Sequence, residues 1–270
     1  MSGETYTVVS TMKNEGPYII DWVAHYKTLG FDHILVCTND CTDTTVEILL
    51  RLQEMGLVTQ HNTIVRRAGI HRSALRQASR RYDIVMDATW VFVCDVDEYL
   101  NVHLGDGSVQ ALVKGSGPDA DVISVPWRVF GAGGIEGFVD KPVTQQFRKG
   151  EYEWDADLRP ETGKFVKSLY TNQHKFQRMG LHAPVSFEDH VGDTLRVLPG
   201  GAEYIVNGQR TDNRGTAGDR AHGDVEPRRD DDQRHPHRDQ PDHGHVLTDI
   251  HQVAGREEEL RLRGDERHHD

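Results

Sequence analysis

The chain changes composition abruptly near residue 204, and this change limits the part of it that can form a core. All 20 aromatic residues lie at or before Tyr204, and all eight lysines lie at or before Lys175. The 61 residues from Arg210 to Asp270 hold 11 Arg, 16 Asp or Glu and eight His, but only seven Val, Leu or Ile. Such a segment buries too little apolar surface to offset the entropy that ordering costs. We therefore expect a folded domain over residues 1–200 and a charged, disordered tail over 201–270, in which only 246–262 has the spacing of a weak helix.

The first 200 residues alternate between strand and helix patterns. Apolar, β-rich runs predict strands at 5–12, 33–38, 59–65, 90–94 and 122–130. Apolar residues at helical spacing predict helices at 17–29, 44–55 and 72–81. Two local signals refine this pattern: Thr44 and Glu47 have the spacing of a capping box, and Pro126 suggests an edge strand or a bend. The alternation predicts an α/β fold with a doubly wound, mostly parallel sheet.

Polar loops follow three of the predicted strands, at 13–16, 39–43 and 95–98. Ligands of such sheets bind outside the carboxyl ends of the strands, where these loops would meet. If the chain stays extended, Asp95 and Asp97 point the same way and Glu98 points opposite. Two adjacent carboxylates favour a hard divalent cation, Mg²⁺ or Mn²⁺, and the simpler alternative is a solvated acidic turn. A phosphatase of the haloacid dehalogenase type is disfavoured, because the motif follows the fourth strand and Tyr99 replaces the expected Thr or Val.

Charge and cysteine content narrow the class of protein further. The formal net charge of −12 argues against a general nucleic-acid-binding protein and against docking on an anionic membrane surface. No apolar run approaches the ~18 residues of a spanning helix, and the N-terminus lacks a secretory signal pattern. The three cysteines, Cys37, Cys41 and Cys94, are too few and too scattered for a disulfide framework. We therefore expect a cytoplasmic protein.

Several segments together resemble one enzyme family. MKNEGPYIIDWVAHYKTLGFDHILVCTNDCTD (12–43) and VFVCDVDEYL (91–100) are similar to the glycosyltransferase family 2-like proteins with a GT-A fold. Within that family they resemble the branch with a Lys-Asn-Glu loop and an Asp-Val-Asp-Glu motif. The segments 127–131 (WRVFG) and 180–184 (GLHAP) also look like parts of this branch. The resemblance covers about residues 5 to 190.

The resemblance implies a nucleoside diphosphate sugar donor, an unidentified glycan or small-molecule acceptor and a divalent metal. It places Asp95 and Asp97 at the metal and diphosphate. Residues matching positions that line the nucleotide pocket are Asn14, Glu15, Asp40 and Asp43. Turn and cap chemistry is the alternative role for Asn14 and Asp43.

Other candidates are each weighed against a structural role. Arg72 is placed to reach a phosphate, whereas its neighbours in the local arginine cluster fit a solvated helix face paired with acidic residues. His182 is a candidate third metal ligand or a hydrogen-bonded structural histidine. An inverting transfer needs a general base, for which Glu136 and Asp140 are candidates, while Glu188–Asp189 has a different context.

These observations predict a metal-dependent glycosyltransferase, and two alternatives stay open. One is an inactive nucleotide-sugar-binding remnant that lacks the C-terminal elements of the family. The other is a nucleotidyltransferase, which normally has a Gly-rich, basic loop after its first strand where this chain has Lys13 to Gly16. The sequence identifies neither the sugar, the base nor the acceptor.

The composition of the tail generates a prediction about its gene. Arg, Gly, Pro, His and Asp have GC-rich codons or nearly so, whereas Lys, Phe and Tyr codons are AT-rich, so a shifted frame in GC-rich DNA yields such a mixture. We hypothesise that the chain leaves the family's frame between about Pro199 and Arg210. Translating the other two frames beyond codon 199 should then reveal a continuation with aromatic residues, Lys and Arg. If neither frame does so, the tail is native.

Overall fold

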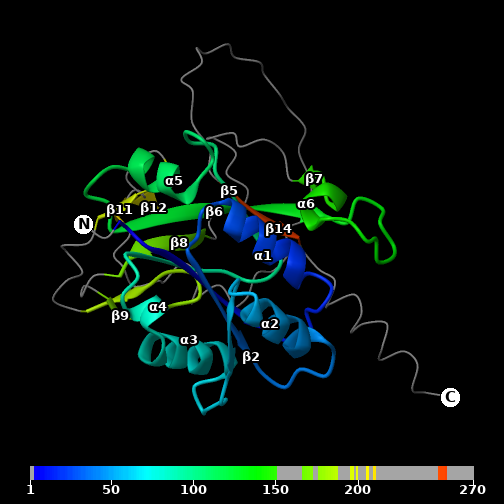
Figure 1. Cartoon of the computed structure of the whole chain (residues 1–270). Coiled ribbons are helices and arrows are strands. Elements are labelled where there is room, and N and C mark those ends of the chain that lie inside the picture. Colours follow the sequence, from blue (N-terminus) through cyan, green and yellow to red (C-terminus); the bar gives the residue numbers. More distant parts are fainter. Residues whose placement is uncertain are drawn as a thin grey trace, which may run out of the picture.

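The structure, a computed structural model, is one large mixed sheet with helices on both faces (Figure 1). It describes residues 3–150, 166–172, 176–187, 195–197 and 199, and the short strands at 205–206, 209–210 and 249–253. The main sheet has the strand order β3-β2-β1-β4-β8-β6-β14-β5, and β7 and β11 pair with β6. Its strands are β1 (Tyr6–Met12), β2 (His33–Thr38), β3 (Thr59–Asn62), β4 (Trp90–Val93), β5 (Glu98–Asn101), β6 (Val122–Gly131), β7 (Lys149–Gly150), β8 (Val166–Thr171), β11 (Arg196–Val197) and β14 (Asp249–Val253).

The remaining elements are the helices and two small strand pairs. The strand pairs are β9 (Phe176–Arg178) with β10 (Val185–Ser186), and β12 (Ile205–Val206) with β13 (Gln209–Arg210). The helices are α1 (Ile19–Thr28), α2 (Thr45–Glu54), α3 (Ile70–Arg81), α4 (Asp83–Met86), α5 (Val109–Ser116) and α6 (Val143–Gln146). Within the described residues, none of these helices has the length and apolar character needed to cross a bilayer.

Alternating residues of the central strands form two separate cores. Val8 of β1 packs in the cluster that also holds the buried faces of α1, α2 and α5, whereas Val9 packs in the cluster that holds α3 and α4. β2 and β4 alternate in the same way, because successive side chains of a strand point to opposite faces. These strands are therefore apolar on both faces, as the doubly wound prediction requires.

The local sequence explains how α1 is placed. Ile19, Trp22, Val23 and Tyr26 recur at helical spacing, and all four are buried. The helix begins two residues after the predicted Pro17, because a turn from Glu15 to Tyr18 precedes it. Gly30 follows the end of α1 with φ at +91°, and a side chain there would meet Gln110. Glycine is therefore required at the point where the chain turns toward β2.

The strand pairing confirms that the predicted polar loops share one edge of the sheet. β1 runs parallel to both β2 and β4, with Met12 opposite Thr38 and Val9 opposite Val93. The loops that follow β1, β2 and β4 therefore leave the sheet at the same carboxyl edge. β8 pairs antiparallel with both β4 and β6, so the sheet is mixed.

Three local predictions were wrong. β3 ends at Asn62 and not at Val65, because the Gln77 side chain of α3 takes the N–H and carbonyl of Ile64 at 3.2 and 2.8 Å. Thr44 makes no capping hydrogen bond, and the Asp43 carboxylate accepts the Thr45 N–H instead at 3.0 Å. β6 is an interior strand, so the edge-strand alternative for Pro126 is wrong; Pro126 falls where, among the described residues, neither β11 nor β14 pairs with it.

Part of the predicted tail also joins the sheet. β14 lies inside the segment considered as a weak helix, yet it is a strand that pairs parallel with β6 and antiparallel with β5. Backbone groups alone make such pairings, so a polar segment with few apolar residues can form them. The rest of the predicted tail from 211 onward lies outside the described residues, and the domain boundary at residue 200 stays a prediction.

The burial of the cysteines predicts their reactivity. Burial raises the pKa of Cys37 to about 12 and the pKa of Cys94 well above its usual value, whereas Cys41 is only partly buried. A thiol reagent at neutral pH should therefore modify Cys41 alone in the native protein and all three cysteines in denaturant. Mass spectrometry after alkylation measures this, and Cys41→Ser should remove the native reaction. Rapid labelling of Cys37 or Cys94 would contradict the fold.

Candidate functional site

The acidic segment after β4 turns sharply at the carboxyl edge of the sheet. Val96 and Asp97 form a turn, and the Glu98 N–H donates to the Asp95 carbonyl at 3.2 Å. The condition that the chain stays extended is therefore not met, since a turn precedes β5, which begins at Glu98. Burial nevertheless alternates: Asp95 and Asp97 are partly exposed, whereas Val96 and Glu98 are buried. The two aspartates can thus reach a ligand, and the glutamate faces the interior.

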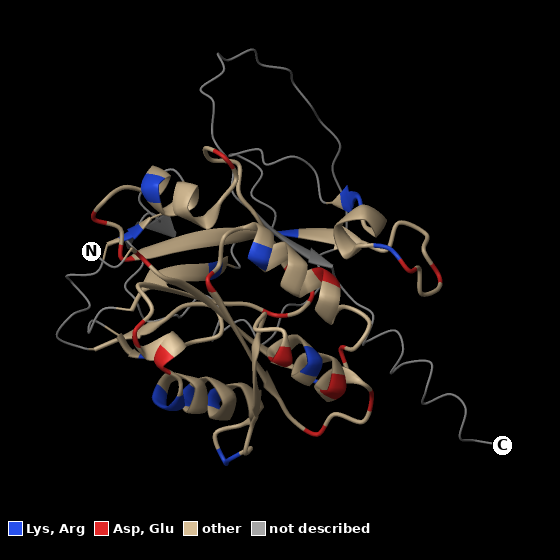
Figure 2. Cartoon of the chain, in the orientation of Figure 1, with Lys and Arg blue, Asp and Glu red and all other residues tan. Residues whose placement is uncertain are grey.

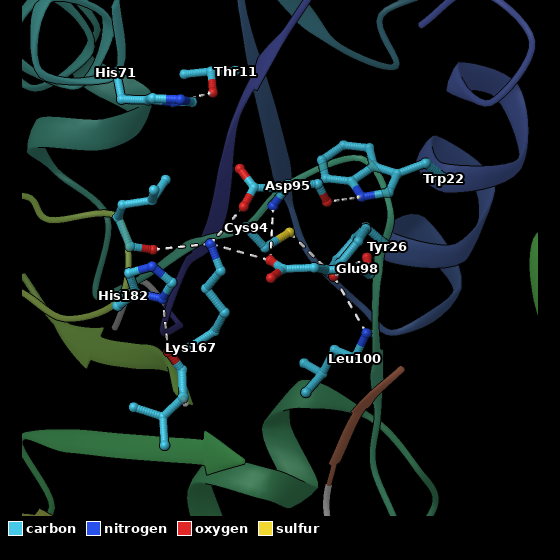
Figure 3. Close-up of polar contacts among 12 residues, drawn as sticks. Thr11, Trp22, Tyr26, His71, Cys94, Asp95, Glu98, Leu100, Lys167 and His182 are labelled. Carbon is cyan, nitrogen blue, oxygen red and sulfur yellow. Dashed lines mark hydrogen bonds and ion pairs between the residues drawn. The ribbon is translucent and has the colours of Figure 1, made fainter. Parts of the chain in front are cut away.

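A buried lysine of β8 holds this segment together (Figure 3). Lys167 Nζ lies 2.8 Å from Asp95 Oδ2 and 3.2 Å from Glu98 Oε2. It also donates to the Leu181 carbonyl at 3.1 Å. The side chains of Lys167 and Glu98 are fully buried, while that of Asp95 is 30% exposed. The three donors of one ammonium therefore join the acidic segment, β8 and the segment that precedes His182.

The charges of this cluster depend on one another. Burial disfavours the charged form of Lys167, but Glu98 and Asp95 outweigh it and raise the pKa of Lys167, so the lysine stays protonated. Burial raises the pKa of Glu98; Lys167 opposes this rise, and Asp95 and Asp97 add to it. Glu98 Oε2 also accepts the Asp95 N–H at 2.9 Å, whereas Oε1 has no hydrogen-bond partner among the described residues. Lys167 thus compensates for the negative charge of the acidic cluster, which lies beside an apolar core.

Helix α1 fixes the backbone of the same segment. Trp22 Nε1 donates to the Asp95 carbonyl at 3.0 Å, and the Tyr26 hydroxyl donates to the Glu98 carbonyl at 3.0 Å. The Tyr26 oxygen also accepts the Leu100 N–H at 3.3 Å and the Cys94 thiol at 3.2 Å. Both aromatic side chains are fully buried. The position of Asp95 is therefore set from two sides, by α1 and by β8.

The loops after β1 and β2 hold each other by hydrogen bonds. Asn14 Oδ1 accepts the Thr42 N–H at 2.7 Å, and Asp43 Oδ2 accepts the Gly16 N–H at 3.1 Å. Burial opposes ionisation of Asp43, but hydrogen bonds from Thr45 and Gly16 lower the pKa of Asp43 below its ordinary value. The turn and cap roles considered for Asn14 and Asp43 are thus present in the structure.

Two residues of these loops adopt left-handed backbone conformations. Asn14 has φ at +59° and Asp40 has φ at +46°. Asn and Asp tolerate this region better than other non-glycine residues, and such conformations are common at ligand sites. Asp40 is exposed, and its Oδ2 accepts only a 3.2 Å hydrogen bond from Asn39 among the described residues. The backbone of Glu15 also contacts the start of α2, because its N–H donates a hydrogen bond to Thr45 Oγ1 at 2.7 Å.

The start of α3 lies at the same edge of the sheet. His71 Nδ1 is 2.9 Å from Thr11 Oγ1, close to the end of β1 (Figure 3). Arg72 is the next residue and is exposed. Arg72 therefore lies in the first turn of α3, near the end of β1, and its contact to a phosphate stays a prediction.

His182 is linked to the acidic segment through Lys167. Its Nδ1 donates to the Val166 carbonyl at 3.2 Å, and its ring lies 5.4 Å from the Trp127 ring. The neighbouring residue, Leu181, accepts the lysine hydrogen bond. Across the described residues, however, no three His, Cys, Asp or Glu side chains are grouped so as to hold a metal ion. The metal role of His182 stays a prediction, and its structural role is visible.

The two candidate bases lie on a different loop. Glu136 and Asp140 are exposed in the loop between β6 and α6, and no described contact joins them to the acidic segment. The end of this loop is anchored, because Asp21 Oδ2 accepts both the Val143 N–H at 2.8 Å and the Tyr99 hydroxyl at 3.1 Å. The catalytic role of Glu136 or Asp140 stays a prediction. Glu188–Asp189 lies outside the described residues.

Lys167 is the site residue that sequence reasoning missed. It is the one charged residue of β8 (VKSLYT), a strand buried throughout its length. A lone lysine in an otherwise uncharged, β-rich run is the signal that would have pointed to a buried carboxylate partner.

The fold and the site define an α/β protein with a braced acidic segment at the carboxyl edge of its sheet. The model of glycosyltransferase family 92 matches residues 7–205, and the chain therefore belongs to that family. The prediction that the chain is a glycosyltransferase is thus confirmed. The family it belongs to is family 92, whereas its motifs had suggested the family 2-like proteins. The match ends at residue 205, within the range where the composition changes.

Solved structures show weaker similarity. S. aureus TarS shares 13% identity, with a TM-score of 0.37, over 50% of this chain and 23% of that chain. A shorter TarS structure in complex with UDP shares 18%, with a TM-score of 0.35, over 50% and 38%. Glucosyl-3-phosphoglycerate synthase from Mycobacterium tuberculosis with Mn²⁺, UDP and glucosyl-3-phosphoglycerate shares 20%, with a TM-score of 0.35, over 63% and 57%. This chain thus spans only part of the length of each, and among curated proteins no match was found.

The buried cluster predicts a large stability effect. Lys167→Met leaves Glu98 buried without its cation and should destabilise the fold by about 3–5 kcal/mol. The double variant Glu98→Gln/Lys167→Met removes both charges of the buried pair and should recover most of that loss. Urea unfolding of the full chain measures both. Equal destabilisation by the single and double variants would show that packing, and not charge, explains the effect.

Proposed function

We propose that this protein transfers a glycosyl group from a nucleoside diphosphate sugar to a hydroxyl acceptor. One observation carries the proposal: the Asp95–Glu98 segment is braced by Lys167, Trp22 and Tyr26 at the edge where β1, β2 and β4 end. A ligand of a doubly wound sheet binds at that edge, and membership of glycosyltransferase family 92 supports a sugar donor as this ligand. The donor, the acceptor and the residue roles below are proposals.

The nucleoside would bind over the loops after β1 and β2. Asp40 is exposed there, and its carboxylate suits the ribose hydroxyls or a base edge, since an ionised carboxylate only accepts hydrogen bonds. Asn14, Glu15 and Asp43 would hold the shape of this pocket through the contacts between the two loops. Arg72, at the start of α3, would contact a phosphate.

The residues present fit a divalent metal that binds together with the donor. Asp95 keeps one carboxylate oxygen without a hydrogen bond to any described residue, and Asp97 adds a second partly exposed carboxylate. Mg²⁺ is commonly bound by one or two carboxylates together with substrate phosphates and water, so a preformed three-ligand group is not required. Asp97 and the outer oxygen of Asp95 would hold the ion, with His182 as a further candidate. Such an ion would neutralise charge on the departing diphosphate.

The chain itself would position the reactants and move one proton. Lys167 and Trp22 keep Asp95 in place, so little reorganisation is needed when the donor binds. An acceptor oxygen would attack the anomeric carbon as the bond to the diphosphate breaks, which inverts that centre. The hydroxyl proton would pass to a carboxylate, for which Glu136 and Asp140 are candidates.

A second candidate function is donor binding without transfer. It is favoured by the end of the family match at residue 205 and by the loss of aromatic residues and lysines beyond Tyr204. A bound donor with neither transfer nor hydrolysis would distinguish this remnant from an enzyme.

Substitution of Asp97 tests the proposed metal and diphosphate site. Asp97→Asn removes an anionic ligand with little change in shape, so we expect at least tenfold weaker binding of UDP with Mn²⁺ by calorimetry and an unchanged melting temperature. Asp119→Asn, at an exposed aspartate elsewhere, is the matched control and should bind as the native chain does.

Protection of Cys41 locates the nucleotide in the same experiment. Cys41 lies in the loop after β2, so UDP with Mn²⁺ should slow its alkylation. Undiminished UDP affinity in Asp97→Asn would reject the metal role, and binding without Cys41 protection would place the nucleotide elsewhere.

A further inference from the structure

One flank of the molecule carries a surface of arginines that form no ion pair with the described residues. We define the basic surface as the exposed arginines of α3 and of the loop that precedes it: Arg66, Arg67, Arg72, Arg76, Arg80 and Arg81. Figure 2 shows basic residues in blue along the ribbon of α3 and in that loop. No ion pair joins any of them to an Asp or Glu of the described residues. The sequence had suggested a helix face paired with acidic neighbours. The described part of the structure therefore concentrates positive charge on α3 and the loop before it, in a chain whose net charge is −12.

The stability of α3 does not account for this charge. The first turn of α3 has no acidic residue, and Gly69 at its start provides no side-chain cap. Arg72 lies in that turn and Arg66 and Arg67 precede it, at the helix end where the macrodipole favours anions. Only Arg80 and Arg81, in the last turn, suit the helix dipole. The other arginines gain nothing from the helix dipole, so helix stability does not explain their position.

Aliphatic residues are exposed among the same arginines. The exposed fractions are 49% for Ile64, 42% for Val65 and 41% for Ile70. Gln77 binds the backbone of Ile64 at both its N–H and its carbonyl, so this loop is fastened to α3. Arginines interspersed with exposed aliphatic side chains suit the interface of an anionic bilayer. A nucleic-acid strand would call for aromatic stacking platforms, and a soluble polyanion would not need the apolar residues.

We propose that the basic surface docks the protein on an anionic phospholipid bilayer. The arginines bind lipid phosphates, while Ile64, Val65 and Ile70 enter the interfacial region. The net charge of the chain argues against a membrane partner. Charges farther than about 8 Å from the bilayer are, however, largely screened at physiological salt, so the charge of the local surface determines whether the protein binds. The proposal does not depend on the proposed transferase activity. It would set the bilayer beside the carboxyl edge of the sheet, where His71 contacts Thr11.

Vesicle binding by the full chain tests the proposal. We expect the protein to co-sediment with phosphatidylcholine vesicles that contain about one-third phosphatidylserine and not with pure phosphatidylcholine, and to be released by salt. Arg66→Gln/Arg67→Gln/Arg76→Gln leaves the candidate phosphate contact Arg72 intact. Loss of each arginine should lower the affinity for the vesicles about fivefold, so this triple variant should bind them about 100-fold more weakly.

Two further variants make the test specific. Lys114→Gln/Lys141→Gln/Arg148→Gln removes as much positive charge from exposed positions on or near α5 and α6, and should bind vesicles as the native chain does. Ile64→Asn/Val65→Asn should weaken vesicle binding but not binding of dextran sulfate, a soluble polyanion.

Three results would overturn the proposal. The first is no binding of the native chain to the anionic vesicles. The second is equal loss in the two charge variants. The third is a tight complex with dextran sulfate combined with vesicle binding that Ile64→Asn/Val65→Asn leaves unchanged, which would identify a soluble polyanion as the partner.

Discussion

The contact between Lys167 and the acidic segment is the interaction on which the site depends. A fully buried ammonium is stable only where carboxylates compensate for the water that it loses, and Asp95 and Glu98 do so at 2.8 and 3.2 Å. The same contact gives the two carboxylates different environments. Glu98 is buried and structural, whereas Asp95 keeps one oxygen toward the edge of the sheet. Lys167 thus stabilises Glu98 in the interior, while Asp95 and Asp97 remain partly exposed.

The loops that follow β1 and β2 at the same edge of the sheet show the same division of roles. The side chains of Asn14 and Asp43 accept hydrogen bonds from backbone groups of the opposite loop, whereas Asp40 is exposed at the end of β2. Asn14 and Asp40 adopt left-handed conformations, which Asn and Asp tolerate better than other non-glycine residues. The contacts between the two loops therefore leave the carboxylate of Asp40 accessible at the edge of the sheet.

Local pattern was sufficient to predict β1, β2, β4, α1 and α3 to within a few residues, because these elements alternate between two buried faces or repeat at helical spacing. It was also sufficient to place three polar loops at one edge, since parallel strands end together. It failed for contacts between distant segments. The partner of Asp95 lies 72 residues further along the chain, and nothing near the motif points to it. β14 was missed because backbone pairing, and not an apolar pattern, holds it in the sheet.

The position of β8 has a consequence for how the protein is made. β8 is the strand between β4 and β6, yet it is synthesised after both, so β4 has an open edge until residues 166–171 leave the ribosome. Until then the acidic segment also lacks its cation, and its carboxylates repel one another. The closing of the sheet and the neutralisation of the acidic cluster are therefore one event in folding. A nascent chain that stalls before β8 would present both an unpaired strand edge, which is prone to pair with other chains, and uncompensated charge.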